Sequence, residues 1–227
     1  MHPRLLRLLT TTGITAFVAV GMSGCFLGDD QKQDVSYGVS GQVRTLVIEG
    51  HTGDVKVTGG GTAVEVTEHQ NYRDKPPATT HAVVDGTLTL TYDCSGCGVG
   101  YDVQVPAGTV VKVQAETGNV LLAGLTADVQ AATRTGDVGA SGLGSTGGAE
   151  LSAQTGSVTA AFTVDPQRVA ASTQTGNVRV SVPLGPGYAV RATTDTGNVK
   201  VSIPRQDGAA RTITATAGTG NVTVNGA

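Results

Sequence analysis

The sequence predicts an all-β protein from three observations: a short phrase that repeats, side chains that alternate with a period of two, and a composition rich in glycine without tryptophan. The phrase is Thr-Gly, a small polar residue and Val, and six copies lie between Thr117 and Val222 at intervals of 18 to 23 residues. A seventh copy lies earlier in the chain. The copies place turns at Thr52-Gly53-Asp54, Thr117-Gly118-Asn119, Thr135-Gly136-Asp137, Thr155-Gly156-Ser157, Thr175-Gly176-Asn177, Thr196-Gly197-Asn198 and Thr219-Gly220-Asn221.

The residues on either side of each turn alternate between apolar and polar, as strands with one buried face do. Before a turn, small or apolar residues take every second position, for example Val169, Ala171 and Thr173. After the same turn the pattern continues with Val178 and Val180. Each copy therefore predicts a strand, a tight turn at a glycine with positive φ, and a second strand.

A constant repeat of about 20 residues is typical of a solenoid in which every copy forms one coil. We therefore expect a parallel β-helix, in which coils stack about 4.8 Å apart and place Thr over Thr. An antiparallel β-sandwich is the alternative, because Gly and Asn also mark hairpins. The order Gly-Asn, rather than the Asn-Gly that hairpins prefer, favours the β-helix. The small inward residues predict a thin core.

The chain opens with the features of a secretory signal peptide, which we assign to residues 1–24. Arg4 and Arg7 form its basic start, and a mainly apolar segment leads to Cys25. The sequence Ser-Gly-Cys around the cleavage point resembles the lipobox of bacterial lipoproteins, with Met22 in place of the usual leucine. The resemblance implies that Cys25 becomes the first mature residue and carries lipid. An ordinary signal peptide that leaves a free Cys25 is the alternative.

Composition and the position of the repeats divide the rest of the chain into a tether and one domain. Residues 25–41 hold the lipidated cysteine and a polar segment that predicts a flexible tether. We assign residues 42–227 to a single β-solenoid domain, with an irregular first part over 42–108 and regular repeats over 109–225. The net charge is −3 for the whole chain, and about −5 once Arg4 and Arg7 leave with the signal peptide. A surface of this charge does not favour nucleic acid.

Cys94 and Cys97 are the other two cysteines. With lipid on Cys25 they form an even pair, and an oxidising compartment outside the cytoplasmic membrane favours a disulfide between them. A redox site of the thioredoxin type would need the pair at the start of a helix, whereas strands flank it here. A zinc site would need two further ligands, for which His69 and His81 are available.

After the cysteine pair the chain reads Tyr-Asp-Val-Gln-Val-Pro-Ala-Gly from Tyr101 to Gly108, and the repeated turns follow. This ordered set resembles a family of bacterial envelope proteins called putative adhesins, a domain of unknown function often carried by actinobacterial lipoproteins. The resemblance covers roughly Val43 to Val224. It implies a β-helical fold at the cell surface and transfers no catalytic or ligand-binding residue.

The repeats do not predict an enzyme, a cofactor or a metal site. Enzymes that act on acidic polysaccharides need clustered charged groups, whereas the acids of this chain come about one per coil. The outward position directly before each turn predicts a ridge of mixed charge instead. This ridge consists of Glu116, Arg134, Gln154, Gln174 and Asp195.

Together these features predict a bacterial lipoprotein, anchored through Cys25 on the extracytoplasmic face of the cell membrane, that acts by contact as an adhesin-like or scaffold protein. The expected partner is wall polymer or another envelope protein. Self-association is a second hypothesis, because the chain ends three residues after Val224 and nothing caps the edge of its last coil. An enzyme or binding module for acidic polysaccharide is a third.

Overall fold

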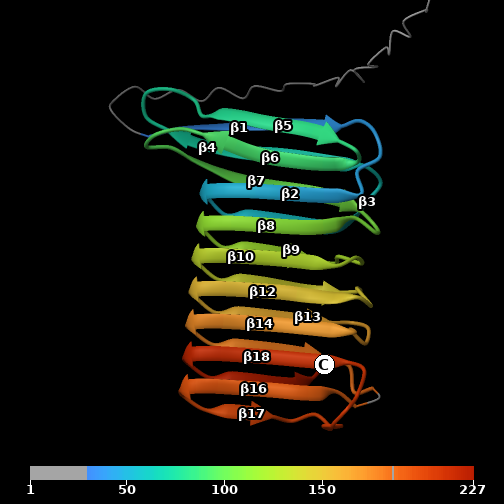
Figure 1. Cartoon of the computed structure of the whole chain (residues 1–227). Helices are drawn as coiled ribbons and strands as arrows, with labels where there is room; N and C mark the ends of the chain where they lie inside the picture. Colours follow the sequence, from blue (N-terminus) through green and yellow to red (C-terminus); the bar gives the residue numbers. More distant parts are fainter. Residues whose placement is uncertain (1–29, 186) are drawn as a thin grey trace, which may run out of the picture.

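The computed structural model describes residues 30–185 and 187–227. The predicted signal peptide over residues 1–24 and the predicted lipid attachment at Cys25 lie outside the described residues. The described part of the chain is all-β and forms two mixed sheets that face each other (Figure 1). It contains no helix with the length and apolar character that crossing a membrane requires.

Strand pairing defines the order of the strands within each sheet. The ten-stranded sheet consists of β1 (Gln31–Val39), β4 (Val64–Tyr72), β7 (Gly98–Pro106), β3 (Val55–Gly61), β9 (Val120–Ala123), β11 (Val138–Leu143), β13 (Val158–Phe162), β15 (Val178–Val182), β19 (Val222–Gly226) and β17 (Val199–Val201). The nine-stranded sheet consists of β16 (Ala189–Thr196), β18 (Thr212–Thr219), β14 (Arg168–Thr175), β12 (Gly148–Thr155), β10 (Val129–Thr135), β8 (Val110–Thr117), β2 (Thr45–Thr52), β6 (Thr87–Asp93) and β5 (Ala78–Val84).

Each repeat contributes one strand to each sheet, and we call such a pair of strands with its turn a coil. Neighbouring coils pair in parallel and in register, so that Thr135 lies opposite Thr117 and Val138 lies opposite Val120. This pairing is the stacking of like on like that the repeats predict, and it is not the pairing of an antiparallel β-sandwich. Antiparallel pairing is confined to β1 with β4, β4 with β7, and β5 with β6 among the described strands.

The core lies between the two sheets and is built from the alternating apolar set. In the coil of β14 and β15, the side chains of Val169, Ala171, Val178 and Val180 are all at most 2% exposed. Each of these residues lies opposite an equally buried residue of the next coil, such as Ile213 opposite Val169. The hydrophobic contribution is therefore repeated from coil to coil in the interior of the stack, with no single large centre.

Each turn needs glycine for two reasons: its backbone has a positive φ, and the adjacent coil leaves no room for a Cβ. All seven have φ between 139° and 145°, a region that other residues rarely adopt. A Cβ on Gly156 would also lie 1.9 Å from the carbonyl oxygen of Gly136 in the adjacent coil. On its other side, the N–H of Gly156 donates to the carbonyl of Thr175 in the following coil at 2.9 Å.

The residue after each glycine ties the coils together through its side chain. Its oxygen accepts the backbone N–H of the equivalent residue in the next coil, as when Asn119 donates to Asp54 at 2.7 Å and Ser157 donates to Asp137 at 2.7 Å. The remaining bonds of this ladder join Asp137 to Asn119, Asn177 to Ser157, Asn221 to Asn177 and Asn198 to Asn221. The predicted stacking of Asn and Asp residues is thus a directional chain of hydrogen bonds.

The order of the coils in space differs from their order in the chain at the C-terminal end. The last coil, β18 and β19, lies between the coil of β14 and β15 and the coil of β16 and β17 (Figure 1). The expectation of an open edge on the C-terminal coil is therefore wrong, because both of its strands are paired on both sides. The more apolar strand takes the inner place: Ile213, Ala215 and Ala217 are at most 1% exposed.

The first part of the domain is more regular than the sequence predicts. Strands β6 and β7 pair in parallel with β2 and β3, so they form a further coil in which the segment from Cys94 to Cys97 replaces the Thr-Gly turn. The prediction of a flexible tether over residues 25–41 is wrong for Gln31–Val39, which form β1. Val35, Tyr37 and Val39 face inward there and pack on the core, which gives this polar segment a buried face.

We expect Gly156→Ala to lower the free energy of unfolding by about 3 kcal/mol, because the new Cβ meets the Gly136 carbonyl and the backbone is strained. Gly124→Ala is the matched control, since Gly124 has φ of 63° but nothing within 4 Å of the added Cβ. Its expected cost is about 1 kcal/mol. Thermal and denaturant unfolding measure both, and equal costs would contradict the role of the close approach.

Candidate functional site: the outer face of the nine-stranded sheet

Strand register sorts the outward side chains of the nine-stranded sheet into rows that run along the stack. One row, which we call the floor row, consists of Glu49, Gln114, Ala132, Ser152 and Ser172. A second, the ridge row, lies directly before the turns and consists of His51, Glu116, Arg134, Gln154 and Gln174. From Ala132 onward the floor row is made of small side chains beside the longer residues of the ridge row.

A shallow groove of about 750 Å³ follows these rows over six strands, from β6 to β14, and the difference in side-chain length shapes its part over β10, β12 and β14. Ala132, Ser152 and Ser172 lie along its bottom, and Arg134, Gln154 and Gln174 along one side. Two consecutive coils present the same pair, Ser152 with Gln154 and Ser172 with Gln174. The groove therefore repeats one set of hydroxyl and amide groups at the spacing of the coils.

The charges of the ridge row gather at the end of the groove nearest β2. Glu116 lies 3.4 Å from the His51 ring and 3.7 Å from the Arg134 guanidinium. All three side chains are at least half exposed, so these contacts contribute little to stability. The predicted ridge is present from Glu116 to Gln174, but Asp195 is separated from it because Gly218 of the inserted coil takes the next position.

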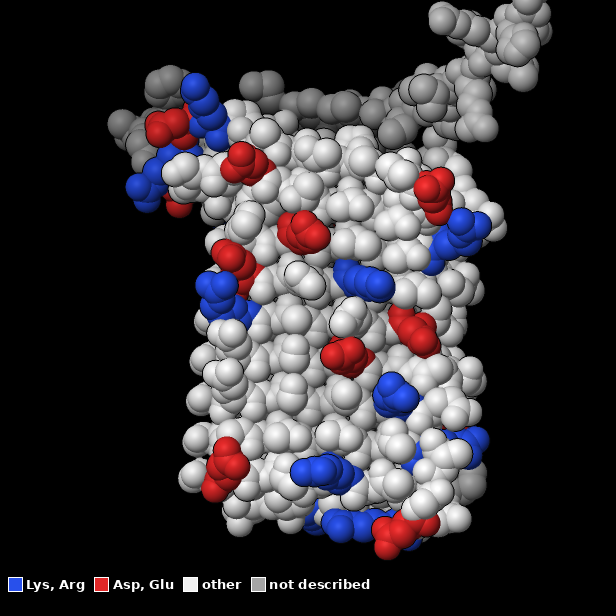
Figure 2. Space-filling model, in the orientation of Figure 1, with Lys and Arg blue, Asp and Glu red and all other residues white. Residues whose placement is uncertain are grey.

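On the other side of the floor row, Lys112, Gln130 and Glu150 form a third outward row. The Gln130 amide donates to the Glu150 carboxylate at 3.3 Å. Beyond them lies a second hollow, of about 480 Å³, with Arg168 at its edge. Figure 2 shows this face of the molecule, where acidic and basic side chains are interspersed and no patch of a single sign forms. The face thus offers mixed polar contacts without a strong net field.

The turn residues that the sequence singles out have a structural role. The side-chain oxygens of Asp54, Asn119, Asp137, Ser157 and Asn177 each accept a backbone N–H from the neighbouring coil. The Asp54 and Asp137 carboxylates are therefore engaged in the stack. Among the described residues, no three His, Cys, Asp or Glu side chains lie together as a metal site would require.

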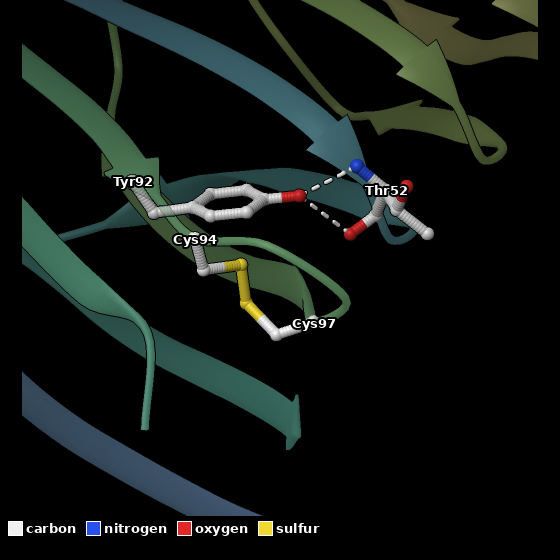
Figure 3. The surroundings of a disulfide bond; sticks show 4 residues. All are labelled: Thr52, Tyr92, Cys94 and Cys97. Carbon is white, nitrogen blue, oxygen red and sulfur yellow. Dashed lines mark hydrogen bonds between the residues drawn. A yellow bond between two sulfur atoms is a disulfide. The ribbon is translucent and has the colours of Figure 1, made fainter. Parts of the chain in front are cut away.

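The cysteine pair forms a disulfide with a Cα to Cα distance of 5.9 Å (Figure 3). Beside it the Tyr92 hydroxyl accepts the N–H of Thr52 at 2.5 Å and donates to the carbonyl of Thr52 at 2.8 Å. Thr52 begins the first Thr-Gly turn. Tyr92 thus ties the coil that lacks the Thr-Gly phrase to the first coil that has it, whereas the disulfide closes the turn of the coil that lacks it.

A buried polar cluster near β1 was not predicted from the sequence. Glu68 is 1% exposed, and its two carboxylate oxygens accept bonds from the Tyr37 hydroxyl at 2.7 Å and the Gln70 amide at 3.0 Å. Burial, and then the bond to Glu68, raise the pKa of Tyr37 well above its ordinary value, so its hydroxyl stays protonated and donates. The His81 ring stacks on Tyr37 with centroids 4.4 Å apart. These contacts join β1, β4 and β5 at the end of the stack.

The two histidines considered for zinc do not converge. His69 lies 2.8 Å from Asp34 and 3.7 Å from Asp102 on the exposed face of the ten-stranded sheet. His81 lies in the other sheet, against Tyr37. Neither histidine contacts the cysteines in these interactions, and Cys94 and Cys97 are bonded to each other in the disulfide.

Known structures resemble this fold, although no protein-family model and no curated protein matches the sequence. A putative cell adhesion protein of Clostridium sporogenes ATCC 15579 has a TM-score of 0.50 and 11% identity, covering 87% of this chain and 100% of that protein's. A putative adhesin of Bacteroides fragilis NCTC 9343 has a TM-score of 0.48 and 15% identity, covering 88% and 99%. At such identities the first similarity is one of fold.

We expect Tyr37→Phe to destabilise the protein by about 2 kcal/mol, because the buried Glu68 carboxylate loses a hydrogen-bond donor. Tyr72→Phe is the control, since the Tyr72 hydroxyl bonds Gln33 at 3.1 Å in a partly buried place. It should cost about 1 kcal/mol or less. Denaturant unfolding followed by tyrosine fluorescence measures both, and a smaller effect at Tyr37 than at Tyr72 would contradict the assignment.

Proposed function

We propose that this protein is a lipid-anchored, non-catalytic protein of the bacterial cell envelope that acts by contact, in the manner of an adhesin. Its two sheets are best understood as the walls of a parallel β-helix with coils of about 20 residues. The fold similarity to a putative cell adhesion protein supports this class. The partner that we favour is a polymer of the cell wall.

The observation that carries the proposal is the groove along the floor row. Two consecutive coils, about 4.8 Å apart, present the same pair of groups, Ser152 with Gln154 and Ser172 with Gln174, so a partner with a repeating structure would meet equivalent groups in both. Many weak contacts of this kind add together along a polymer, as linked binding sites do. A single compact ligand would use only a fraction of the groove.

The chemistry of the groove favours a partner rich in hydroxyl groups. Ser152, Gln154, Ser172 and Gln174 supply neutral donors and acceptors, which suit glycan hydroxyls better than a highly charged chain. The acidic and basic groups lie mainly at one end, around Glu116. This distribution disfavours the alternative of an enzyme on acidic polysaccharide, which would need its charged groups together.

Filling the groove tests the proposed function. Ser172→Arg places a long charged side chain on its bottom and should reduce covalent crosslinking to wall glycan on intact cells by about tenfold, which corresponds to about 1.4 kcal/mol of binding energy. Thr159→Arg is the matched control, because Thr159 is an exposed residue of β13 on the opposite sheet. Equal crosslinking by both variants and the unchanged protein would overturn the proposal.

Anchoring is tested at Cys25. Cys25→Ser should release the protein from the membrane fraction or leave its precursor uncleaved, because the serine cannot carry the thioether-linked lipid. Replacing both Cys94 and Cys97 by serine is the control, since it removes the disulfide but leaves the lipobox cysteine, and membrane association should persist. Membrane retention of Cys25→Ser, fully processed, would contradict the lipobox interpretation.

A further inference from the structure

The two ends of the stack are closed to different degrees. At the end formed by β1 and β5, inward residues are covered, with Tyr37 7% and Val39 6% exposed. At the other end, formed by β16 and β17, Val199 is 42% exposed, whereas the equivalent Val222 of the next coil is fully buried. Val190, Ala192 and Val201 are likewise only partly buried. The coil of β16 and β17 therefore leaves core positions uncovered.

The backbone of β16 is also open along most of its outer edge. The Ala189 N–H donates to Arg211, toward β18, so the alternation of a strand turns Val190, Ala192 and Thr194 toward the open side. The Gln206 N–H closes this edge only at its start, by donating to the carbonyl of Tyr188. Among the described residues, no acceptor contacts the N–H of Gly197, which in every other copy of the turn binds the next coil.

The exposed face of β16 carries charges in a self-complementary order. Arg191, Thr193 and Asp195 point outward, with Thr193 midway between the two charged residues. If two β16 strands pair antiparallel about Thr193, Arg191 of each lies opposite Asp195 of the other. Opposite charges directly across an antiparallel pair are stabilising. The same register places Ala192 of one copy opposite Thr194 of the other, so the inward-facing side chains of the two β16 strands also lie side by side.

We propose that this end of the stack is an interaction surface for a second copy of the same chain, with β16 pairing antiparallel to β16 about a two-fold axis at Thr193. Such an isologous contact uses the same patch on both molecules and closes after two. It covers Val199 and Val201 and extends both sheets from one copy into the other. The edge strands that remain belong to the covered ends near β1 and β5.

The two-fold arrangement places Thr193 of one copy beside Thr193 of the other. The backbone N–H and C=O of each Thr193 point to β18 of its own copy, so the two residues do not hydrogen-bond each other. Such a non-hydrogen-bonded pair has a Cα separation of about 4.5 Å, which lies within the range that a disulfide spans. A cysteine at Thr193 would therefore join the two copies. Thr193 is exposed, so its substitution leaves the packing of the fold unchanged.

The test uses the full-length protein on intact cells, oxidised briefly and analysed without reductant. Thr193→Cys should form a covalent dimer at about ten times the level of Ser172→Cys, which lies in the same outward row two coils inside the stack. Equal crosslinking of the two variants would overturn the proposal. A ladder of larger species would overturn it as well, because a two-fold contact does not extend beyond two copies.

Charge exchange provides a second, independent readout in sedimentation of the detergent-extracted protein. Arg191→Asp places like charges opposite each other twice in the interface and should weaken association by about tenfold. Adding Asp195→Arg reverses the order of the pair and restores the complementarity, so the double variant should associate like the unchanged protein. Failure of the double variant to recover, with both proteins folded, would contradict the proposed register.

Discussion

The whole stack depends on the absence of a side chain at the glycine of each turn. The carbonyl of one glycine occupies the space where the Cβ of the next would lie, at 1.8 to 2.1 Å in contacts such as Gly220 to Gly176 and Gly118 to Gly53. This close approach brings the turns within hydrogen-bonding distance and fixes the parallel register of the strands on both sides. The ladder of Asn, Asp and Ser side chains and the rows on the outer face both follow from that register.

The regular part of the fold could be predicted because its signals are local and repeated. The period of two before and after each turn identifies the buried residues, and the constant spacing identifies which residues stack. Val169, Ala171, Val178 and Val180 are buried as that pattern indicates. The groove could be foreseen only in part, because its shape depends on the small residues Ala132 and Ser152 lying beside a longer row, which requires the register.

The exceptions lie where neighbours in space are distant in sequence. The coil of β6 and β7 lacks the Thr-Gly phrase, although Leu88, Leu90 and Tyr101 alternate like the other coils. β1 was not predicted because the composition of its segment is polar. Nothing in the local sequence distinguishes the buried Glu68 from an exposed glutamate, since its partners Tyr37 and Gln70 are set by the pairing of β1 with β4. The exchange of the last two coils depends on which of two similar strands is more apolar.

That exchange determines when the protein can finish folding. A ribosome releases β16 and β17 before β18 and β19, yet the strands against which β16 and β17 pair are the last to be made. The stack therefore cannot grow by adding each coil in chain order. Strands β16 and β17 cannot reach their final pairing until β18 and β19 have been made and have inserted beside β14 and β15. Residues from Thr212 onward complete this end of the stack. A chain that stops before Thr212 would lack the coil of β18 and β19, and the coil of β16 and β17 would lose the strands with which it pairs.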